Sequence, residues 1–382
     1  MTRHWSVSKD SLEINQMPFY WRLSNSKDTV ADITPRLPIR IVIDSDFDYL
    51  RCDVRDLEWQ VIDAAYRKNE NIGFLNEESG QLQTYGSSVN NFFLDSVRRF
   101  SPENIYEIGC GAGLSIQYLK KNGWDVIGID PSEYSLYASR KLGFSLLNNF
   151  FNEDLLKAPA DFIFCNDVFE HVRDAASFSK KVYESLANGG VFCFATTNST
   201  ESISIGDISM LEHQHVNMFT ERSIYQILQN AGFSIIEVKN GSYGNTFHVT
   251  AKKNNSHNYI GENLSSKVSC LGFFERAKKV ITAFESFYEK TDNLHCYVPL
   301  RCMPYLASVG DYGRSPVYDS NAAWRGKYID GYSQPIFSSD DITNADDSTF
   351  FIGSLTFHKE IKSMLKGRGF SDQVIYCIFD FL

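Results

Sequence analysis

The chain has 382 residues and a formal net charge of −10. This length exceeds what one compact core usually holds, so we expect two or three units. The acidic balance and the lack of a basic block argue against nucleic acid or an anionic membrane surface as the main partner. No apolar run is long enough to span a bilayer, and residues 1–10 carry no apolar leader segment. These features predict a cytoplasmic protein without membrane insertion.

The eight cysteines are scattered along the chain and form no Cys-x-x-Cys pair. Neither a zinc ribbon nor a disulfide framework is therefore predicted. We expect ordinary buried thiols.

The first hundred residues precede the regular part of the chain. Residues 1–40 are polar and aromatic, contain several prolines and show one strand-like run at Pro18–Leu23. This composition predicts an irregular arm. Apolar residues at helical spacing predict helices over Asp53–Asn69 and Ser87–Phe100. The loop between them ends around Tyr85 and would lie over a cofactor mouth, either as a lid or as part of a plain packing pair of helices.

Short apolar runs alternate with amphipathic helical segments from residue 104 to residue 251. This alternation is typical of a doubly wound α/β sheet. A helix over Thr220–Ala231, stopped by Gly232, leads into a strand pair that would close the sheet antiparallel. The expected strands are Asn104–Ile108, Asp125–Ile129, a short third strand before Asn149, Phe162–Asn166, Val191–Thr196, Ser234–Val238 and Phe247–Ala251.

A second, smaller α/β unit is expected after this sheet. A polar linker is followed by a long helix over Val268–Glu289, which we interpret as a packing strut. Further strands and one helix are predicted beyond it, at Cys296–Val298, Ser315–Tyr318, Thr349–Ile352, His358–Lys366 and Gln373–Phe379. The expected division is an N-terminal arm and helical lid region (1–100), the large sheet (101–253), the linker and long helix (254–290) and the smaller unit (291–382).

A glycine-rich turn follows the first strand of the large sheet. Gly109, Gly111 and Gly113 precede a helix predicted over Leu114–Asn122, so the backbone can bend sharply and let a ligand approach closely. Asp130 ends the next strand, where a carboxylate suits the two hydroxyls of a ribose. A nucleoside-containing cofactor is implied.

The residues around this turn indicate which nucleoside is bound. A dinucleotide fingerprint requires its third glycine at the position of Leu114. Glu107 stands two residues before the first glycine, where a carboxylate would repel a pyrophosphate and attract the cationic methionyl part of S-adenosylmethionine. The run Glu107–Gly113 resembles motif I of the class I S-adenosylmethionine-dependent methyltransferases, and Gly128–Ser132 resembles their second signature. The resemblance implies S-adenosylmethionine as the cofactor and a seven-stranded Rossmann-like methyltransferase sheet as the fold.

The resemblance also suggests further cofactor-binding residues at the ends of strands. Pro131 directly follows the acidic strand end. Asn166 and Asp167 leave the fourth strand and would lie near the methionyl end of the cofactor. Asn149 and Phe150 follow the short third strand, where methyltransferases place adenine contacts; Phe150 either stacks on the ring or packs in the core.

Three side chains are the candidates for catalysis: His215, His213 and Tyr85. Histidines two residues apart point the same way in an extended segment, and neutral imidazole is a competent base for a hydroxyl group. Both either serve the acceptor site or have a structural role. Two histidines without a carboxylate at a matching spacing form a weak ligand set, so no metal is predicted. Glu170 and His171 begin the segment after the fourth strand and are equally consistent with a structural role.

The C-terminal unit carries a second resemblance. Asp319-Ser320-Asn321, Gly326-Lys327 and Gly331 show an Asp-x-Asn, Gly-Lys, Gly pattern, and Phe351–Ser354 would be a later strand end. Over residues 85–382 the order of parts resembles bacterial sugar-modifying methyltransferases with a C-terminal Rossmann-like half-domain. Nucleotide-sugar C-methyltransferases of that group carry an N-terminal four-cysteine zinc ribbon, which this chain lacks.

The resemblance implies in-line methyl transfer to a sugar, nucleotide sugar or glycan precursor, assisted by a His, Tyr or Glu base. The aromatic content of 14% suggests the alternative of an O-methyltransferase for a small phenolic or lipid-like acceptor. A cofactor-binding protein without turnover is a third possibility, and a nicotinamide-dependent oxidoreductase is disfavoured by Leu114. The acceptor and the oligomeric state do not follow from the sequence.

Overall fold

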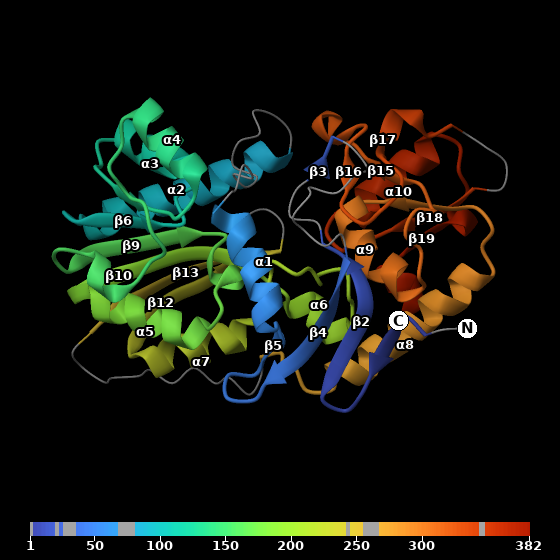
Figure 1. Cartoon of the computed structure of the whole chain (residues 1–382), viewed down its shortest axis with the longest axis horizontal. Helices are drawn as coiled ribbons and strands as arrows, with labels where there is room; N and C mark the ends of the chain where they lie inside the picture. The colour runs from blue at the N-terminus through green and yellow to red at the C-terminus, as the bar shows by residue number, and fades with distance from the viewer. Residues whose placement is uncertain are drawn as a thin grey trace.

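The computed structural model describes residues 3–19, 23–25, 36–67, 81–241, 245–254, 267–343 and 348–382, with residues 81–84 described for their backbone only. Two α/β units lie side by side, and an antiparallel sheet formed mainly by the N-terminal residues lies between them (Figure 1). The polar linker predicted over residues 254–266 falls almost wholly outside the described residues.

The large sheet has seven strands in the order β12-β13-β10-β9-β6-β7-β8. All neighbouring strands are parallel except β13, which is antiparallel to both β10 and β12. The predicted doubly wound seven-stranded sheet is confirmed. Its strands are β6 (Ile105–Ile108), β7 (Ile127–Ile129), β8 (Leu146–Leu147), β9 (Ala160–Asn166), β10 (Leu186–Thr197), β12 (Phe233–Asn240) and β13 (Thr246–Lys253).

Helices cover both faces of this sheet because its central strands are apolar on both sides. In β9, Phe162 and Phe164 belong to the core on one face, and Ile163 and Cys165 to the core on the other. The first face is covered by α2 (Gln81–Phe100), α3 (Leu114–Lys121) and α4 (Glu133–Leu142), and the second by α5 (Ala175–Ser185) and α7 (Glu221–Ala231) (Figure 1).

The expected irregular arm is wrong, because the N-terminal residues form strands. Leu12 and Ile14, and likewise Ile39 and Ile41, are buried at alternate positions, which is the strand period. Pro38 is tolerated because it lies at a register shift between β2 and β4, outside the regular ladder. The sheet has the antiparallel order β1-β2-β4-β5-β11 and consists of β1 (Trp5–Val7), β2 (Ser11–Pro18), β4 (Arg36–Asp44), β5 (Tyr49–Cys52) and β11 (Asn217–Met218).

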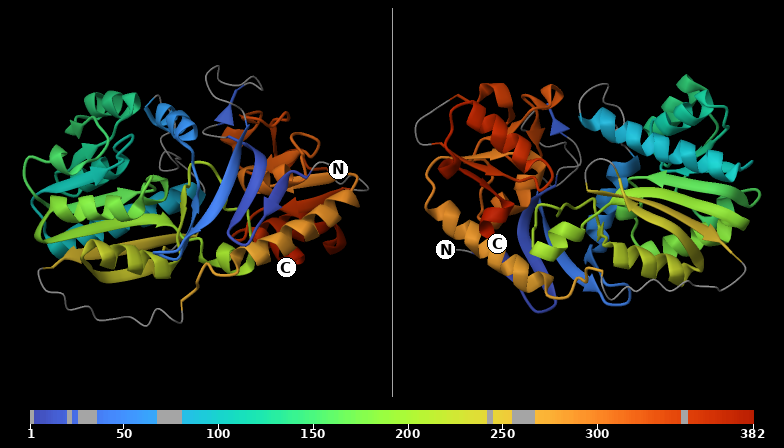
Figure 2. Two further views of the ribbon diagram at one scale, coloured as in Figure 1. Left: turned by 60° about the horizontal axis from the view of Figure 1, so that its bottom comes forward. Right: turned by 180° about the vertical axis from the view of Figure 1, so that it is seen from behind.

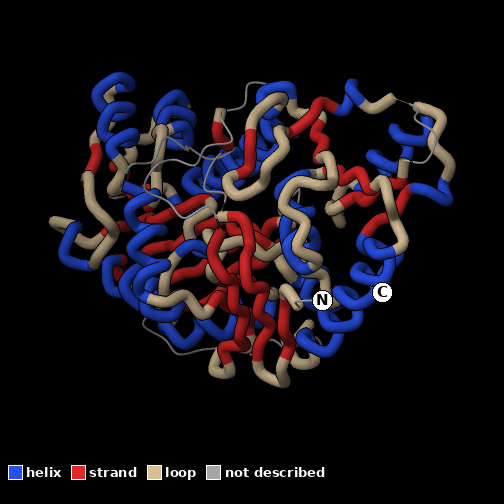
Figure 3. The backbone as a smooth tube through the Cα atoms, turned by 45° about the vertical axis from the view of Figure 1, so that its right-hand side comes forward, coloured by secondary structure: helices blue, strands red, loops and turns tan. Residues whose placement is uncertain are grey.

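This N-terminal sheet connects the two α/β units. Its last strand, β11, belongs in sequence to the large unit, and the short strand β3 (Leu23–Ser24) pairs with β16 (Tyr328–Ile329) of the C-terminal unit. Its buried side chains share one hydrophobic core with the C-terminal unit and with helix α8 (Phe273–Glu289). Figure 3 shows its long strands between the helices of the two units. The helix α1 (Asp56–Arg67) follows directly after β5.

The C-terminal unit is a five-stranded, all-parallel sheet in the order β17-β15-β14-β18-β19, which confirms the predicted second, smaller α/β unit. Helix α8 runs along its outer side (Figure 2). Helix α9 begins with Pro299 at its first position, where the missing N–H costs nothing. The elements are β14 (Leu294–Tyr297), α9 (Pro299–Ser308), β15 (Val317–Asp319), β17 (Ile336–Ser338), β18 (Thr349–Ile352), α10 (His358–Gly367) and β19 (Ile375–Cys377).

The remaining helices of the described ranges are short. They are α6 (Thr200–Ile205) and the 3-10 turns η2 (Glu153–Leu155), η3 (Phe169–His171), η5 (Ala322–Trp324), η6 (Ser339–Asp341), η7 (Asp372–Val374) and η8 (Ile378–Phe381). In the described part of the chain, no helix is both long and apolar enough to cross a membrane. All eight cysteines are buried and free, as predicted.

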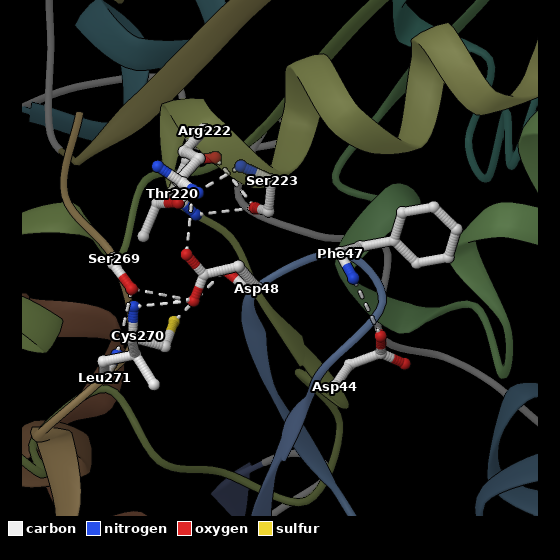
Figure 4. Close-up of polar contacts among 9 residues, drawn as sticks. All are labelled: Asp44, Phe47, Asp48, Thr220, Arg222, Ser223, Ser269, Cys270 and Leu271. Carbon is white, nitrogen blue, oxygen red and sulfur yellow. Dashed lines mark hydrogen bonds and ion pairs between the residues drawn. The ribbon is translucent and has the colours of Figure 1, made fainter. Parts of the chain in front are cut away.

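Asp48 joins three parts of the chain at the turn between β4 and β5 (Figure 4). One carboxylate oxygen accepts hydrogen bonds from Ser269 Oγ at 3.1 Å and Cys270 N at 2.9 Å, just before α8. The other lies 2.9 Å from Arg222 Nε in α7. The N-terminal sheet, the large unit and the start of α8 are therefore held by one side chain.

Candidate cofactor and acceptor site

The glycine-rich turn joins β6 to α3, and its three glycines have φ between +48° and +72°. A Cβ at Gly109 would lie 2.4 Å from Val168 Cγ2, and one at Gly113 would lie 2.4 Å from Phe144 Cε1. A Cβ at Gly111 meets no described atom within 4 Å. Packing therefore requires two of the glycines, whereas Gly111 faces open space where a ligand can approach the backbone.

Asp130 lies across this turn at the carboxyl end of β7 and is 8% exposed. Its Oδ2 accepts a hydrogen bond from Gly111 N at 2.9 Å. Its Oδ1 accepts bonds from Ser132 N at 2.9 Å and Ser132 Oγ at 2.6 Å. The carboxylate is thus fixed beside the open glycine, and Pro131 follows at the same edge of the sheet.

Glu107 lies beneath the turn, in β6, and is buried. Its Oε2 has no hydrogen-bond partner among the described residues. Burial, reinforced by the nearby charge of Asp130, raises the pKa of Glu107 well above its usual range. A buried carboxylate of this kind is stabilised by a cation. The open glycine, the fixed Asp130 and this acid together fit a ribose and a cationic methionyl group.

Asn166 and Asp167 lie at the adjacent strand end, because β9 is the parallel neighbour of β6. Asp167 has a left-handed backbone with φ of 49°. Its Oδ1 accepts a hydrogen bond from Tyr85 Oη at 2.6 Å, and its Oδ2 accepts one from Asn166 Nδ2 at 3.0 Å. The loop expected to end around Tyr85 is wrong: α2 begins at Gln81, and the helix itself directs Tyr85 to this strand end.

The pKa values of both ionisable groups in this contact, Tyr85 and Asp167, are raised. Burial, with a smaller contribution from the charge of Glu170, raises the pKa of Asp167 to about 6. Burial and the neighbouring Asp167 raise the pKa of Tyr85 well above its usual value. At neutral pH, Tyr85 is therefore a hydrogen-bond donor and Asp167 a carboxylate close to its titration point.

Asn149 and Phe150 follow β8 at the same edge of the sheet. Asn149 is exposed, and its Oδ1 accepts a bond from Phe150 N at 2.8 Å. The half-buried ring of Phe150 lies 4.7 Å from the Arg67 guanidinium at the end of α1. Phe150 thus packs against the last residue of α1.

A cluster of one acid and two imidazoles lies beyond Asp167. We call Glu170, His171 and His215 the acid–imidazole cluster; one ligand atom from each lies within 4.8 Å of the other two. His215 comes from the segment before β11, and its ring centroid lies 4.8 Å from that of His171. His215 Nε2 lies 2.8 Å from Glu212 Oε1. The sequence run Asp-Val-Phe-Glu-His indicates two of these residues, Glu170 and His171. Their proximity to His215 is a tertiary contact that the sequence does not reveal.

The two imidazoles of the cluster have different electrostatic environments. Burial lowers the pKa of His171 to about 4, and the proximity of His215 adds to this. Burial also disfavours the charged form of His215, but the adjacent Glu212 carboxylate outweighs it and raises the pKa of His215.

His213 lies apart from this cluster, although only two residues separate it from His215. The segment bends at His213 and Gln214, so the two imidazoles do not follow the alternation of an extended strand. His213 Nε2 instead donates to Leu37 O at 3.2 Å, and its ring lies 5.2 Å from that of Phe19. The structure therefore brings Tyr85 and His215 to the carboxyl edge of the large sheet and places His213 against the N-terminal sheet.

Comparison with known proteins bears directly on residues 82–238, which match the sequence model of a family described as "Methyltransferase domain". Together with the strand order and the glycine–acid site, this match decides the class of the large unit. Residues 82–238 form a class I methyltransferase domain. The match confirms the predicted methyltransferase domain, and the open Gly111, Asp130 and Glu107 fit S-adenosylmethionine as its cofactor.

Similar sequences to the methyltransferase domain include two named ubiquinone biosynthesis O-methyltransferase. The protein from Hydrogenovibrio crunogenus is 29% identical over 133 residues, which are 32% of this chain and 55% of that protein. The one from Rickettsia bellii is 23% identical over 172 residues, 39% of this chain and 70% of that protein. The chain thus spans 55% of the first of these relatives.

Solved structures similar to the methyltransferase domain include a magnesium protoporphyrin IX methyltransferase from Synechocystis with bound S-adenosylmethionine. It is 16% identical, with a TM-score of 0.39, covering 53% of this chain and 99% of that one. An S-adenosylmethionine-dependent methyltransferase from Mesorhizobium loti has a TM-score of 0.33 at 18% identity, covering 41% of this chain and 96% of that one.

Proposed function

We propose that this protein transfers the methyl group of S-adenosylmethionine to a hydroxyl oxygen of a small-molecule acceptor. One observation carries the proposal: at the strand ends of β6, β7 and β9, the glycine turn and Asp130 lie beside a half-buried carboxylate, Asp167, which is held by Tyr85. The relatives named O-methyltransferase support oxygen as the atom that is methylated.

The reaction needs alignment and one proton acceptor. When bound, the cofactor supplies a methyl group on a sulfonium, which is already an activated leaving group. As the acceptor oxygen bonds to the methyl carbon, the electron pair of the carbon–sulfur bond stays on sulfur and the hydroxyl proton must leave. A group that receives it works best when its pKa lies near the working pH.

Asp167 is the group that we propose to take this proton. Its pKa of about 6 leaves it ionised at neutral pH and more basic than an ordinary aspartate. Tyr85 and Asn166 each donate to one of its oxygens and so fix the carboxylate plane. The left-handed backbone at Asp167 is a strain of the kind often found at functional sites. In this proposal Tyr85 positions Asp167, and His215 lines the acceptor side.

Two separate observations each favour a different acceptor class. A phenolic or lipid-like hydroxyl is the first candidate, because the relatives reported above are named for ubiquinone biosynthesis. A sugar or nucleotide sugar is the second, favoured by the parallel C-terminal sheet, whose strand order reverses at β14, where ligands bind in such sheets. From α9, directly after β14, Arg301 donates to Ser209 O at 3.4 Å and so contacts the methyltransferase domain.

Methyl transfer from isotope-labelled S-adenosylmethionine tests the proposal, with catechols, polyprenylated phenols and nucleotide sugars as acceptors and product mass spectrometry as the readout. We expect label on an acceptor oxygen. Asp167→Asn should lower kcat by about 100- to 10,000-fold, the usual contribution of a base, and leave the cofactor Kd within a few-fold. Cofactor binding without a labelled product from any acceptor class would instead support a binding protein without turnover.

A further inference from the structure

The acid–imidazole cluster has the composition and surroundings of a metal site. We propose that Glu170, His171 and His215 bind a divalent transition-metal ion such as Zn²⁺. Two imidazoles and one carboxylate form a ligand set used by catalytic zinc sites, which keep a further position open. The sequence predicted no metal because no carboxylate stands at a matching spacing from His213 and His215. Folding supplies one from another segment.

Each of the three ligands is already oriented by a partner. His171 Nδ1 donates to Gln214 O at 2.8 Å, which leaves the lone pair on Nε2. His215 Nε2 donates to Glu212 at 2.8 Å, which leaves Nδ1. Thr196 Oγ1 donates to Glu170 Oε2 at 2.9 Å. Protein metal ligands are typically held in this way by carboxylates, backbone carbonyls and hydroxyls.

The remaining oxygen of Glu170 points to the same conclusion. Glu170 is fully buried, and its Oε1 has no hydrogen-bond partner among the described residues. Within the described ranges, none of the lysine or arginine ion pairs involves it. Buried carboxylates are usually paired with a cation or bound to a metal. A divalent ion would satisfy Glu170 and the two imidazole lone pairs together.

The separation of the ligand atoms fits a site that closes around its ion. A tetrahedral ion about 2 Å from each ligand atom separates those atoms by about 3.3 Å. One candidate ligand atom from each of the three side chains lies within 4.8 Å of those of the other two. Closing around the ion would therefore bring these atoms together by up to about 1.5 Å. Imidazole ligands favour Zn²⁺ and its neighbours in the transition row over Mg²⁺ and Ca²⁺, which prefer oxygen ligands.

The role of this ion in the reaction rests on the proposed function. An acceptor hydroxyl oxygen would occupy the open position, where a Lewis acid lowers the pKa of a bound hydroxyl. Its proton would pass to Asp167, three residues before Glu170 in the sequence. Its oxygen would form the bond to the methyl carbon as the carbon–sulfur bond of the cofactor breaks and leaves its electron pair on sulfur. Metal binding is measured without the cofactor, so the two proposals can be tested separately.

Binding of Zn²⁺ to the full chain, stripped of metal by EDTA and dialysed, is measured by competition with a chromophoric chelator. We expect one tightly bound ion per chain and, with Co²⁺, the visible absorption of a low-symmetry site. His171→Gln and His215→Gln should each weaken Zn²⁺ binding by more than about 100-fold, and Thr196→Val by about 10-fold. His213→Gln is the matched control: it removes a buried imidazole from the same segment and should leave Zn²⁺ affinity unchanged.

Circular dichroism and thermal unfolding establish that each variant is folded, and Thr196→Val tests the site with every ligand in place. A wild-type chain that binds no stoichiometric ion overturns the proposal, as does equal Zn²⁺ affinity in wild type, H171Q and H215Q. Methyl transfer that persists in the metal-free chain would overturn the role in the reaction. Metal binding without any methyl transfer would support the site and count against the proposed function.

Discussion

Replacing Asp130 by Asn should weaken S-adenosylmethionine binding by about 10- to 100-fold. The carboxylate already accepts three hydrogen bonds, from Gly111 N, Ser132 N and Ser132 Oγ, and these fix it beside the open glycine. In the cofactor complex it would also accept from the ribose hydroxyls. Asn has one acceptor oxygen and no charge, so at least one charge-assisted bond is lost. Such a bond contributes about 1.5–3 kcal/mol, and every 1.4 kcal/mol is about tenfold in Kd.

Isothermal titration with S-adenosylmethionine and S-adenosylhomocysteine measures this change. Asp161→Asn is the matched control, because Asp161 Oδ2 also accepts from backbone amides, those of Glu103 at 3.2 Å and Asn104 at 2.9 Å, next to the amino end of β6. The control should lose stability and keep its cofactor Kd. An Asp130→Asn chain that binds both ligands like wild type would refute the assignment of the ribose to this carboxylate, as would an equal loss in the control.

Three further predictions concern the fold around the site. Gly113→Ala should lower the free energy of unfolding by about 2–5 kcal/mol, because the new Cβ would clash with Phe144 in addition to the strain of the left-handed backbone. Gly111→Ala, which has only the backbone strain, should lower it by about 1–2 kcal/mol. Equal losses for the two variants in urea denaturation would contradict this. Asp48→Asn, which removes the charge at the three-way junction, should cost about 1–3 kcal/mol, and an unchanged unfolding midpoint would count against it. Burial lowers the pKa of His248 to about 4, so the unfolded state binds more protons than the folded state between pH 6.5 and 4. The free energy of unfolding should therefore fall by about 2–3 kcal/mol as the pH drops through this window. In His248→Gln this fall should be smaller. The same pH slope in that variant would disprove the assignment.

Local patterns predicted the large sheet because its strands are continuous apolar runs and its cofactor turn is contiguous in sequence. Gly109 to Gly113 and Asp130 needed only one βαβ unit to be placed correctly. The N-terminal sheet was missed for the opposite reason. Its long strands β2 and β4 bury mainly alternate residues, and its pairing with β11 joins segments far apart in the chain.

The acceptor side was harder to predict, because its geometry depends on turns and tertiary contacts. A bend at His213 and Gln214 separates two imidazoles that an extended segment would have aligned. Glu170 and His215 come together only after β9 and the segment before β11 have folded onto each other. Neither event leaves a periodic signal in the sequence.

A crystal structure of the full chain with S-adenosylhomocysteine tests the proposed site most directly. We expect the ribose hydroxyls on Asp130, the backbone of Gly111 against the ligand, and the sulfur facing Asp167. A ligand bound with its ribose away from Asp130, or with its sulfur directed away from the strand end of β9, would contradict both the cofactor site and the proposed transfer of the methyl group to an acceptor beside Asp167.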